Sequence, residues 1–163
     1  MILIIGYGNS LRQDDGAGLI LANTLAQACR TRDLSARCIT THQLTPELAP
    51  TIAAKEISAV VFVDTRVVLP SEIEPTVQMR SLTATGSSSR LGHHFTPETL
   101  LLYVQLLFDK QPAAWLLTVP GTAFNHGESL SKLTKTALNT APTDQLLSEV
   151  ESVIQEILSP LKI

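Results

Sequence analysis

Short runs of apolar, often β-branched residues recur along the chain and predict five β-strands. They lie at residues 1–5, 36–40, 59–63, 73–79 and 114–119. Apolar residues with the spacing of amphipathic helices occur at residues 16–29, 46–55, 97–108 and 144–158. Strands that alternate with helices predict a three-layer α/β/α fold around a largely parallel five-stranded sheet. The run at 73–79 alternates apolar and polar residues, so we expect it at an antiparallel edge of this sheet.

Length, charge and apolar content narrow the class of protein. A chain of 163 residues suits one domain, which we assign to residues 1–163. Its 12 lysines and arginines against 15 aspartates and glutamates give a net charge of −3, which argues against a nucleic-acid binder. Apolar runs such as 57–63 are much shorter than the roughly 18 residues of a membrane helix, so no membrane span is expected. Residues 1–6 have no basic region and no small-residue cleavage site, so we predict a first strand here and not a signal peptide. We therefore expect a cytoplasmic protein. Cys29 and Cys38 match no disulfide framework and are expected as reduced thiols.

A glycine-rich segment that contains two adjacent aspartates follows the first predicted strand. It reads Gly6-Tyr7-Gly8-Asn9-Ser10-Leu11-Arg12-Gln13-Asp14-Asp15-Gly16-Ala17-Gly18. A dinucleotide-binding loop is disfavoured, because Leu11 stands in place of the third glycine and two carboxylates occupy the position of a pyrophosphate. One acid suffices to cap the following helix. Asp14 is therefore predicted as the N-cap, and Asp15 as the residue that is free for chemistry.

Asp64 comes directly after the third predicted strand. On its own, this residue is equally consistent with a salt bridge to Arg66 or with a role in the turn. If the strand order is 2-1-3, as in many doubly wound sheets, strands 1 and 3 are neighbours and a crevice opens at their carboxyl ends. Asp15 and Asp64 would then face each other across this crevice.

One phrase occurs twice, as His42-Gln43-Leu44-Thr45-Pro46-Glu47 and as His93-His94-Phe95-Thr96-Pro97-Glu98. It is typical of a helix start, with threonine as the N-cap and proline in the first turn. The phrase makes His93, and not His94, the counterpart of His42. Taken singly, a loop histidine is more often only a polar residue. Together with two carboxylates on other loops, however, an imidazole indicates a site for a divalent transition metal.

Three features occur here in one order along nearly the first two thirds of the chain. They are Gly6-x-Gly8-Asn9-x-Leu11-x-x-Asp14-Asp15-Gly16-x-Gly18, an apolar strand that ends in Asp64, and His93-x-Phe95 before a helix. In these features the chain resembles the endopeptidases that mature nickel–iron hydrogenases. The resemblance implies an enzyme that removes a C-terminal extension from the hydrogenase large-subunit precursor once nickel has been inserted. It also implies that Asp15, Asp64 and His93 are the metal ligands and the catalytic residues, although family members often have glutamate at the position of Asp15.

The resemblance sets further expectations for the site. The expected nickel is the one carried by the precursor, which the site would sense, and no tightly bound catalytic cofactor is assigned. Peptide hydrolysis needs a polarised carbonyl and an activated water, which either a metal acting as Lewis acid or a carboxylate acting as general base can supply.

The loop after the second predicted strand is expected to rim the crevice. We therefore expect His42 and Gln43 to contact the substrate and not the metal. The turn His42-Gln43-Leu44 replaces an Asp-Gly-Gly-Thr-like turn found in many family members, and it resembles the branch that serves bidirectional, NAD-coupled hydrogenases. Two alternatives stay open, a non-proteolytic nickel-binding maturation chaperone with the same three ligands and a nucleotide-binding α/β module.

Overall fold

A mixed sheet forms the centre of the computed structural model, which describes residues 1–84 and 95–158. Within these residues five strands pair in the order β2-β1-β3-β5-β4. The strands are β1 (Ile2–Tyr7), β2 (Ala36–Thr41), β3 (Ala59–Val67), β4 (Gln78–Leu82) and β5 (Ala113–Gly121). All neighbours pair in parallel except β4, which runs antiparallel to β5 at one edge. The predicted sheet, its 2-1-3 order and its antiparallel edge are confirmed.

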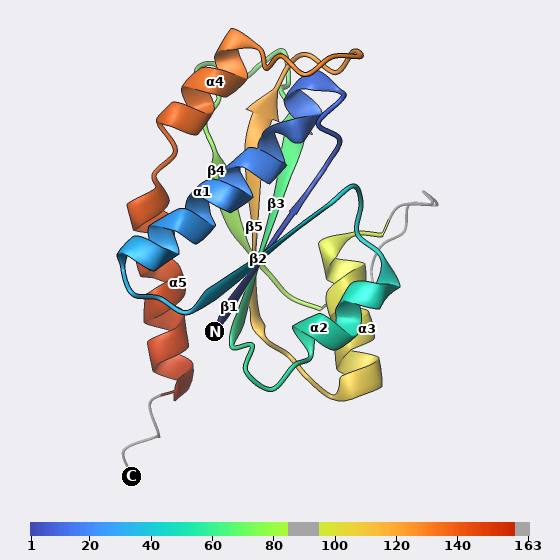
Figure 1. The fold of residues 1–163 in the computed structure, drawn as a ribbon, viewed down its shortest axis with the longest axis vertical. Coiled ribbons are helices and arrows are strands. Elements are labelled where there is room, and N and C mark those ends of the chain that lie inside the picture. Colours follow the sequence, from blue (N-terminus) through green and yellow to red (C-terminus); the bar gives the residue numbers. More distant parts are fainter. Residues whose placement is uncertain (85–94, 159–163) are drawn as a thin grey trace.

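Helices cover both faces of the sheet and complete the three predicted layers (Figure 1). One face carries α1 (Ala17–Thr31), α4 (Lys132–Asn139) and α5 (Thr143–Leu158), and the other carries α2 (Ala49–Ile52) and α3 (Pro97–Phe108). The short 3₁₀ turns η1 (Gln13–Gly16) and η2 (Pro46–Leu48) lead into α1 and α2. Because the connections after β1 and β2 lie on opposite faces, the sheet has its switch point between β1 and β3.

Alternation along β3 divides the core into two parts. Val61 and Val63 pack in the cluster that includes α1 and α5, whereas Val60 and Phe62 pack in the cluster that includes α2 and α3. Successive side chains of a strand point to opposite faces. Asp64 is the next residue on the same face as Val60 and Phe62. Its side chain therefore emerges on the α2–α3 face, where the buried part of the strand ends.

The strand that the alternating pattern predicts at 73–79 is displaced, because β4 spans Gln78–Leu82. Residues 73–77 lie before it and include Pro75, which has no N–H to donate to a strand ladder. The side chain of Ile73 is 91% exposed, so the local alternation there does not reflect burial. Pairing with β5 determines where this strand begins.

Two helical regions also differ from the prediction. The helix predicted at 46–55 is reduced to η2 and the four-residue α2. Pro50 lacks the N–H that a continuous helix through this run requires. Conversely, no helix was predicted at Lys132–Asn139, where α4 lies, because its sequence is rich in lysine and threonine and buries little. Ser131 is the N-cap of this helix, and its hydroxyl accepts a hydrogen bond from the Thr134 N–H at 3.2 Å.

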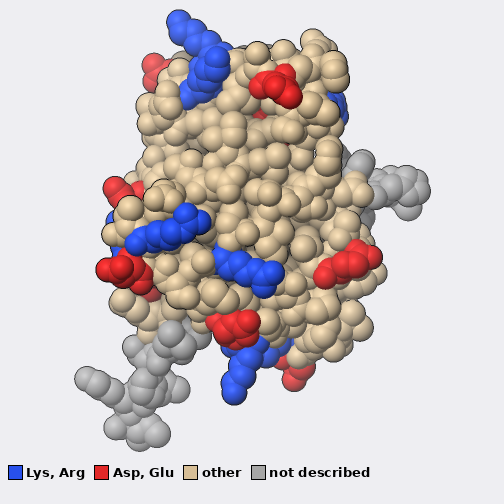
Figure 2. Space-filling view, viewed as in Figure 1, with Lys and Arg blue, Asp and Glu red and all other residues tan. Residues whose placement is uncertain are grey.

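The surface and the cysteines add little to the functional picture. On the face shown in Figure 2, lysine and arginine side chains are interspersed with aspartate and glutamate side chains over the described residues. Among the helices described, none combines the length and apolar composition that a membrane span requires. Both cysteines are free, as expected, with Cys29 buried and Cys38 partly exposed.

Candidate functional site

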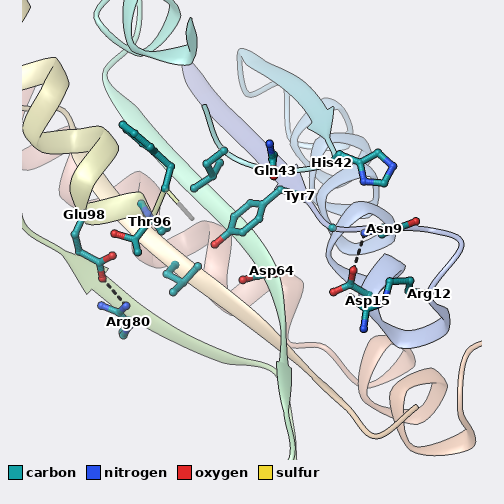
Figure 3. Close-up of a pocket in the computed structure, with 15 residues that line it drawn as sticks. Tyr7, Asn9, Arg12, Asp15, His42, Gln43, Asp64, Arg80, Thr96 and Glu98 are labelled. Atoms are coloured by element: carbon teal, nitrogen blue, oxygen red, sulfur yellow. Dashed lines mark hydrogen bonds and ion pairs between the residues drawn. The ribbon is translucent and has the colours of Figure 1, made fainter. Parts of the chain in front are cut away.

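A cavity of about 580 Å³ opens beside the switch point between β1 and β3 (Figure 3). Its walls come from the end of β1 and the turn η1, the loop after β2, the end of β3, the middles of β4 and β5, and the N-terminal end of α3. The lining residues are Tyr7, Gly8, Asn9, Arg12, Asp15, His42, Gln43, Leu44, Asp64, Arg80, Phe95, Thr96, Pro97, Glu98 and Leu116. Ligands of open α/β sheets bind at this place, beyond the carboxyl ends of the strands.

Asp64 enters the cavity from β3. Its Oδ1 accepts a hydrogen bond from the Thr65 N–H at 2.7 Å, and the Tyr7 hydroxyl is directed toward the same carboxylate. Burial raises the pKa of Asp64 to about 6; the charge of Asp15 adds to this rise, and the hydrogen bonds from Thr65 and Tyr7 oppose it. Burial and the Asp64 charge also raise the pKa of Tyr7, so its phenol stays protonated at neutral pH.

Asp15 enters the same cavity from the η1 turn. Its Oδ2 accepts a hydrogen bond from the Asn9 N–H at 3.0 Å, so the chain after β1 wraps around this carboxylate. Gly8 has φ +140°, and a Cβ at this position would lie 2.1 Å from the Asp15 carbonyl oxygen. Only glycine permits this close turn. The predicted placement of Asp15 and Asp64 at one crevice is confirmed.

Asp14 does not cap a helix, contrary to the prediction. Its side chain is wholly buried and accepts three backbone hydrogen bonds from the β5–α4 loop. The donors are the N–H groups of Thr122 at 2.8 Å, Ala123 at 2.9 Å and Ser131 at 2.7 Å. Desolvation by burial would raise the pKa of Asp14, but these donors outweigh it and hold the pKa below its usual value. Asp14 is therefore an anchor for this loop.

Arg66 does not form the salt bridge with Asp64 that was an alternative interpretation. Its Nη1 lies 2.7 Å from Oε1 of Glu72, within the connection between β3 and β4. Asp64 is thus left with hydrogen-bond donors and without a paired cation among the described residues.

The two histidine phrases behave differently. In the second, the Thr96 hydroxyl accepts from the Thr99 N–H at 3.2 Å, and Pro97 begins α3 as predicted. In the first, Thr45 occupies the N-cap position of η2 without a side-chain cap. His42 and Gln43 line the cavity, in agreement with their predicted place at its rim. The predicted ligand His93, together with His94, lies outside the described residues.

Solved structures show what this architecture is similar to. The hydrogenase maturating endopeptidase HybD from E. coli matches with a TM-score of 0.71 and 16% identity, over 93% of each chain. The [NiFe] hydrogenase maturation protease HybD from Thermococcus kodakarensis matches with a TM-score of 0.63 and 18% identity, over 91% of this chain and 97% of that one. HycI from Thermococcus kodakarensis KOD1 matches with a TM-score of 0.59 and 22% identity, over 95% and 92%. This chain has the hydrogenase maturation endopeptidase fold. No protein-family model and no curated protein sequence matches it.

In this hydrogenase maturation endopeptidase fold, two carboxylates of the kind that can bind metals face one cavity. Carboxylate oxygens suit divalent metals, and Asp15 and Asp64 face one cavity. Residues 1–84 and 95–158 contain no group of three His, Cys, Asp or Glu side chains that could hold a metal ion. A three-donor metal site here would need a further donor, from His93 or from a bound molecule.

Sequence reasoning missed several residues at the cavity. Tyr7 lies inside the glycine-rich motif, and counting alternate positions along β1 would have placed it on the same face as Leu3 and Ile5. Arg80 on β4 and Glu98 on α3 form an ion pair of 2.6 Å across the cavity wall. Partial burial would raise the pKa of Glu98, but the Arg80 hydrogen bond and charge lower it. This pair depends on long-range pairing of β4, which no local pattern reveals.

Proposed function

We propose that this protein is an endopeptidase that removes the C-terminal extension of a nickel–iron hydrogenase large-subunit precursor after nickel insertion. The observation that carries the proposal is the pair of carboxylates, Asp15 and Asp64, at one cavity of a chain with this fold. His93 is the proposed third member of the site. The solved proteins of the same fold are named as maturation endopeptidases, which supports a peptidase reaction.

Hydrolysis adds water across the scissile peptide bond. The water oxygen bonds to the carbonyl carbon, the C–N bond breaks, and the leaving amine takes up a proton. Asp64 has a pKa of about 6, so it is largely ionised at neutral pH and suited to accept a proton from water and return it to the amine. Tyr7 stays protonated and orients the Asp64 carboxylate through its hydroxyl. Asp15 provides the second carboxylate beside the scissile peptide.

The nickel is a part of the substrate in this proposal. Two carboxylates and the imidazole of His93 are donors that suit divalent nickel. Such a site would retain the precursor only after nickel insertion and would place the scissile peptide beside Asp15 and Asp64. When bound, the metal would also polarise the peptide carbonyl.

The loop after β2 is proposed to contact the precursor. His42 and Gln43 lie on one side of the cavity, and Arg80 and Glu98 lie on the other (Figure 3). A peptide between these two walls would pass Asp64. The side chains of this peptide would meet polar groups of the protein on both sides. The cavity therefore favours a peptide segment that is extended and polar.

The test is incubation of the protein with nickel-loaded precursor large subunit, followed by mass measurement of the precursor C-terminus. We expect loss of the extension with nickel-loaded precursor and no loss with the nickel-free precursor. Asp15→Asn and Asp64→Asn should fold and leave the extension intact. If the protein binds nickel-loaded precursor but does not cleave it, the result would overturn the peptidase proposal in favour of a maturation chaperone. If it binds a nucleotide saturably and neither binds nor cleaves the precursor, the result would overturn the proposal in favour of a nucleotide-binding module.

A further inference from the structure

Thr65 connects the elements that carry the two cavity carboxylates. Its hydroxyl donates to the backbone carbonyl of Asp14 at 2.9 Å and accepts from the Gly18 N–H at 3.2 Å. It therefore ties β3 both to the η1 turn and to the first turn of α1. The carbonyl that it holds belongs to the residue directly before Asp15.

The backbone of Thr65 holds the other carboxylate. Its N–H donates to Oδ1 of Asp64 at 2.7 Å, the shortest of these contacts. Thr65 and Asp64 are neighbours on a strand, so their side chains leave on opposite faces of the sheet. One residue thus contacts Asp64 on the cavity side and the turn that carries Asp15 on the α1 side.

Close packing around Thr65 leaves little room for adjustment. A Cβ on Gly121 would lie 2.8 Å from Cγ2 of Thr65 and 3.0 Å from Cβ of Asp14. A Cβ on Gly18 would lie 3.0 Å from Cα of Asp64. These contacts show that β3, β5, η1 and α1 meet here without a gap, so a shift of one element would move the others.

We propose that Thr65 is a positioning residue that sets the placement of Asp15 relative to Asp64, by holding the η1 turn with its hydroxyl and the Asp64 carboxylate with its N–H. This inference deepens the proposed function and rests on it for the kinetic test. Thr65 does not line the cavity, and it acts through the two aspartates. Catalytic groups lose much of their effect when they are displaced by about 1 Å, so loss of this brace should reduce turnover.

The variant Thr65→Val removes the hydroxyl and keeps the branched shape and the N–H. We expect kcat for processing of nickel-loaded precursor to fall about 10- to 100-fold, with KM nearly unchanged. Thr65→Ser keeps the hydroxyl and should restore most of the turnover. If Thr65→Val fails to fold, Thr65→Ser and Thr65→Ala, which differ only by the hydroxyl oxygen, give the same comparison.

Val150→Ala is the control for destabilisation, because Val150 is buried in the core beneath α5 and does not line the cavity. Its truncation should lower the melting temperature while kcat stays near that of the wild type. Equal loss of kcat in Thr65→Val and in this control would show a general effect of destabilisation and would overturn the proposal.

Crystal structures of the wild type and Thr65→Val, grown without metal, separate this inference from the proposed function. A changed separation of the Asp15 and Asp64 carboxylates in the variant would support positioning by Thr65 even if the wild type cleaves no precursor. An unchanged separation would overturn it even if the wild type is an active peptidase.

Discussion

Replacing Asp14 by alanine gives the sharpest test of how the site is supported. The side chain is wholly buried and accepts three N–H groups at 2.7–2.9 Å. Hydrogen bonds to a charged group contribute about 1.5–3 kcal/mol each, part of which is offset by the cost of burying the charge. We therefore expect Asp14→Ala to reduce the free energy of unfolding by about 3–5 kcal/mol. A residue that only capped a helix would lose about 1 kcal/mol.

Thermal and urea unfolding measure this difference. For a chain of this size, the expected loss corresponds to a decrease in melting temperature of about 10 °C. Asp14→Asn keeps one acceptor oxygen and should lie between the wild type and Asp14→Ala. Asp144→Ala is the control, because Asp144 is 87% exposed and its ion pair with Arg32 contributes little. A loss of 1 kcal/mol or less in Asp14→Ala, about that of a cap, would refute the anchoring role.

The pH dependence provides a second measurement of the same residue. Burial acts against ionisation of Asp14, but the N–H donors prevail and its pKa is lowered in the folded state. Stability from such a group is fully present above the unfolded pKa of about 3.9 and is lost as pH falls through the folded value. The difference between the wild type and Asp14→Ala should therefore be constant near neutral pH and shrink below about pH 4.

Three further predictions concern the cavity. Burial raises the folded-state pKa of Asp64 to about 6, so the metal-free wild type should lose stability as the pH rises from about 4 to above 6. Asp64→Asn should lack this loss. Unfolding at several pH values measures the difference. His93→Ala should abolish nickel or cadmium binding in a calorimetric titration and His94→Ala should retain it, and the reverse result would place the ligand one residue later. His42→Ala should weaken precursor processing with metal affinity near that of the wild type, whereas a collapse of affinity beyond the 10- to 100-fold typical of indirect effects would make His42 a ligand.

The parallel part of the fold could be predicted from sequence because its signals are local and strong. Strands that are buried on both faces read as continuous apolar runs, such as Val60 to Val63 in β3. The edge strand β4 has a weaker signal, since only one of its faces and one of its neighbours constrain it. Its bounds were therefore misplaced, and with them the ion pair that Arg80 forms with Glu98.

The carboxylate pair could be predicted for a similar reason. Asp15 and Asp64 each follow a recognisable strand, and the 2-1-3 order brings the ends of those strands together. The role of Tyr7 depends on which face of β1 it occupies, and the partner of Arg66 depends on the irregular connection after β3. Neither follows from residue spacing alone.

Asp14 and Asp15 show most clearly where local reasoning ends. Adjacent residues of a 3₁₀ turn point about 120° apart, so two neighbouring acids cannot serve the same site. In η1 this geometry directs Asp15 to the cavity and Asp14 to the β5–α4 loop, whose donors lie 108–117 residues away along the chain. A helix N-terminus needs only one acid. The presence of Asp14 beside Asp15 is explained by the distant loop that Asp14 holds. The side chain of Asp14 holds this loop, and its carbonyl accepts from the Thr65 hydroxyl. The residue predicted to be a helix cap therefore supports the position of Asp15, its neighbour in the cavity.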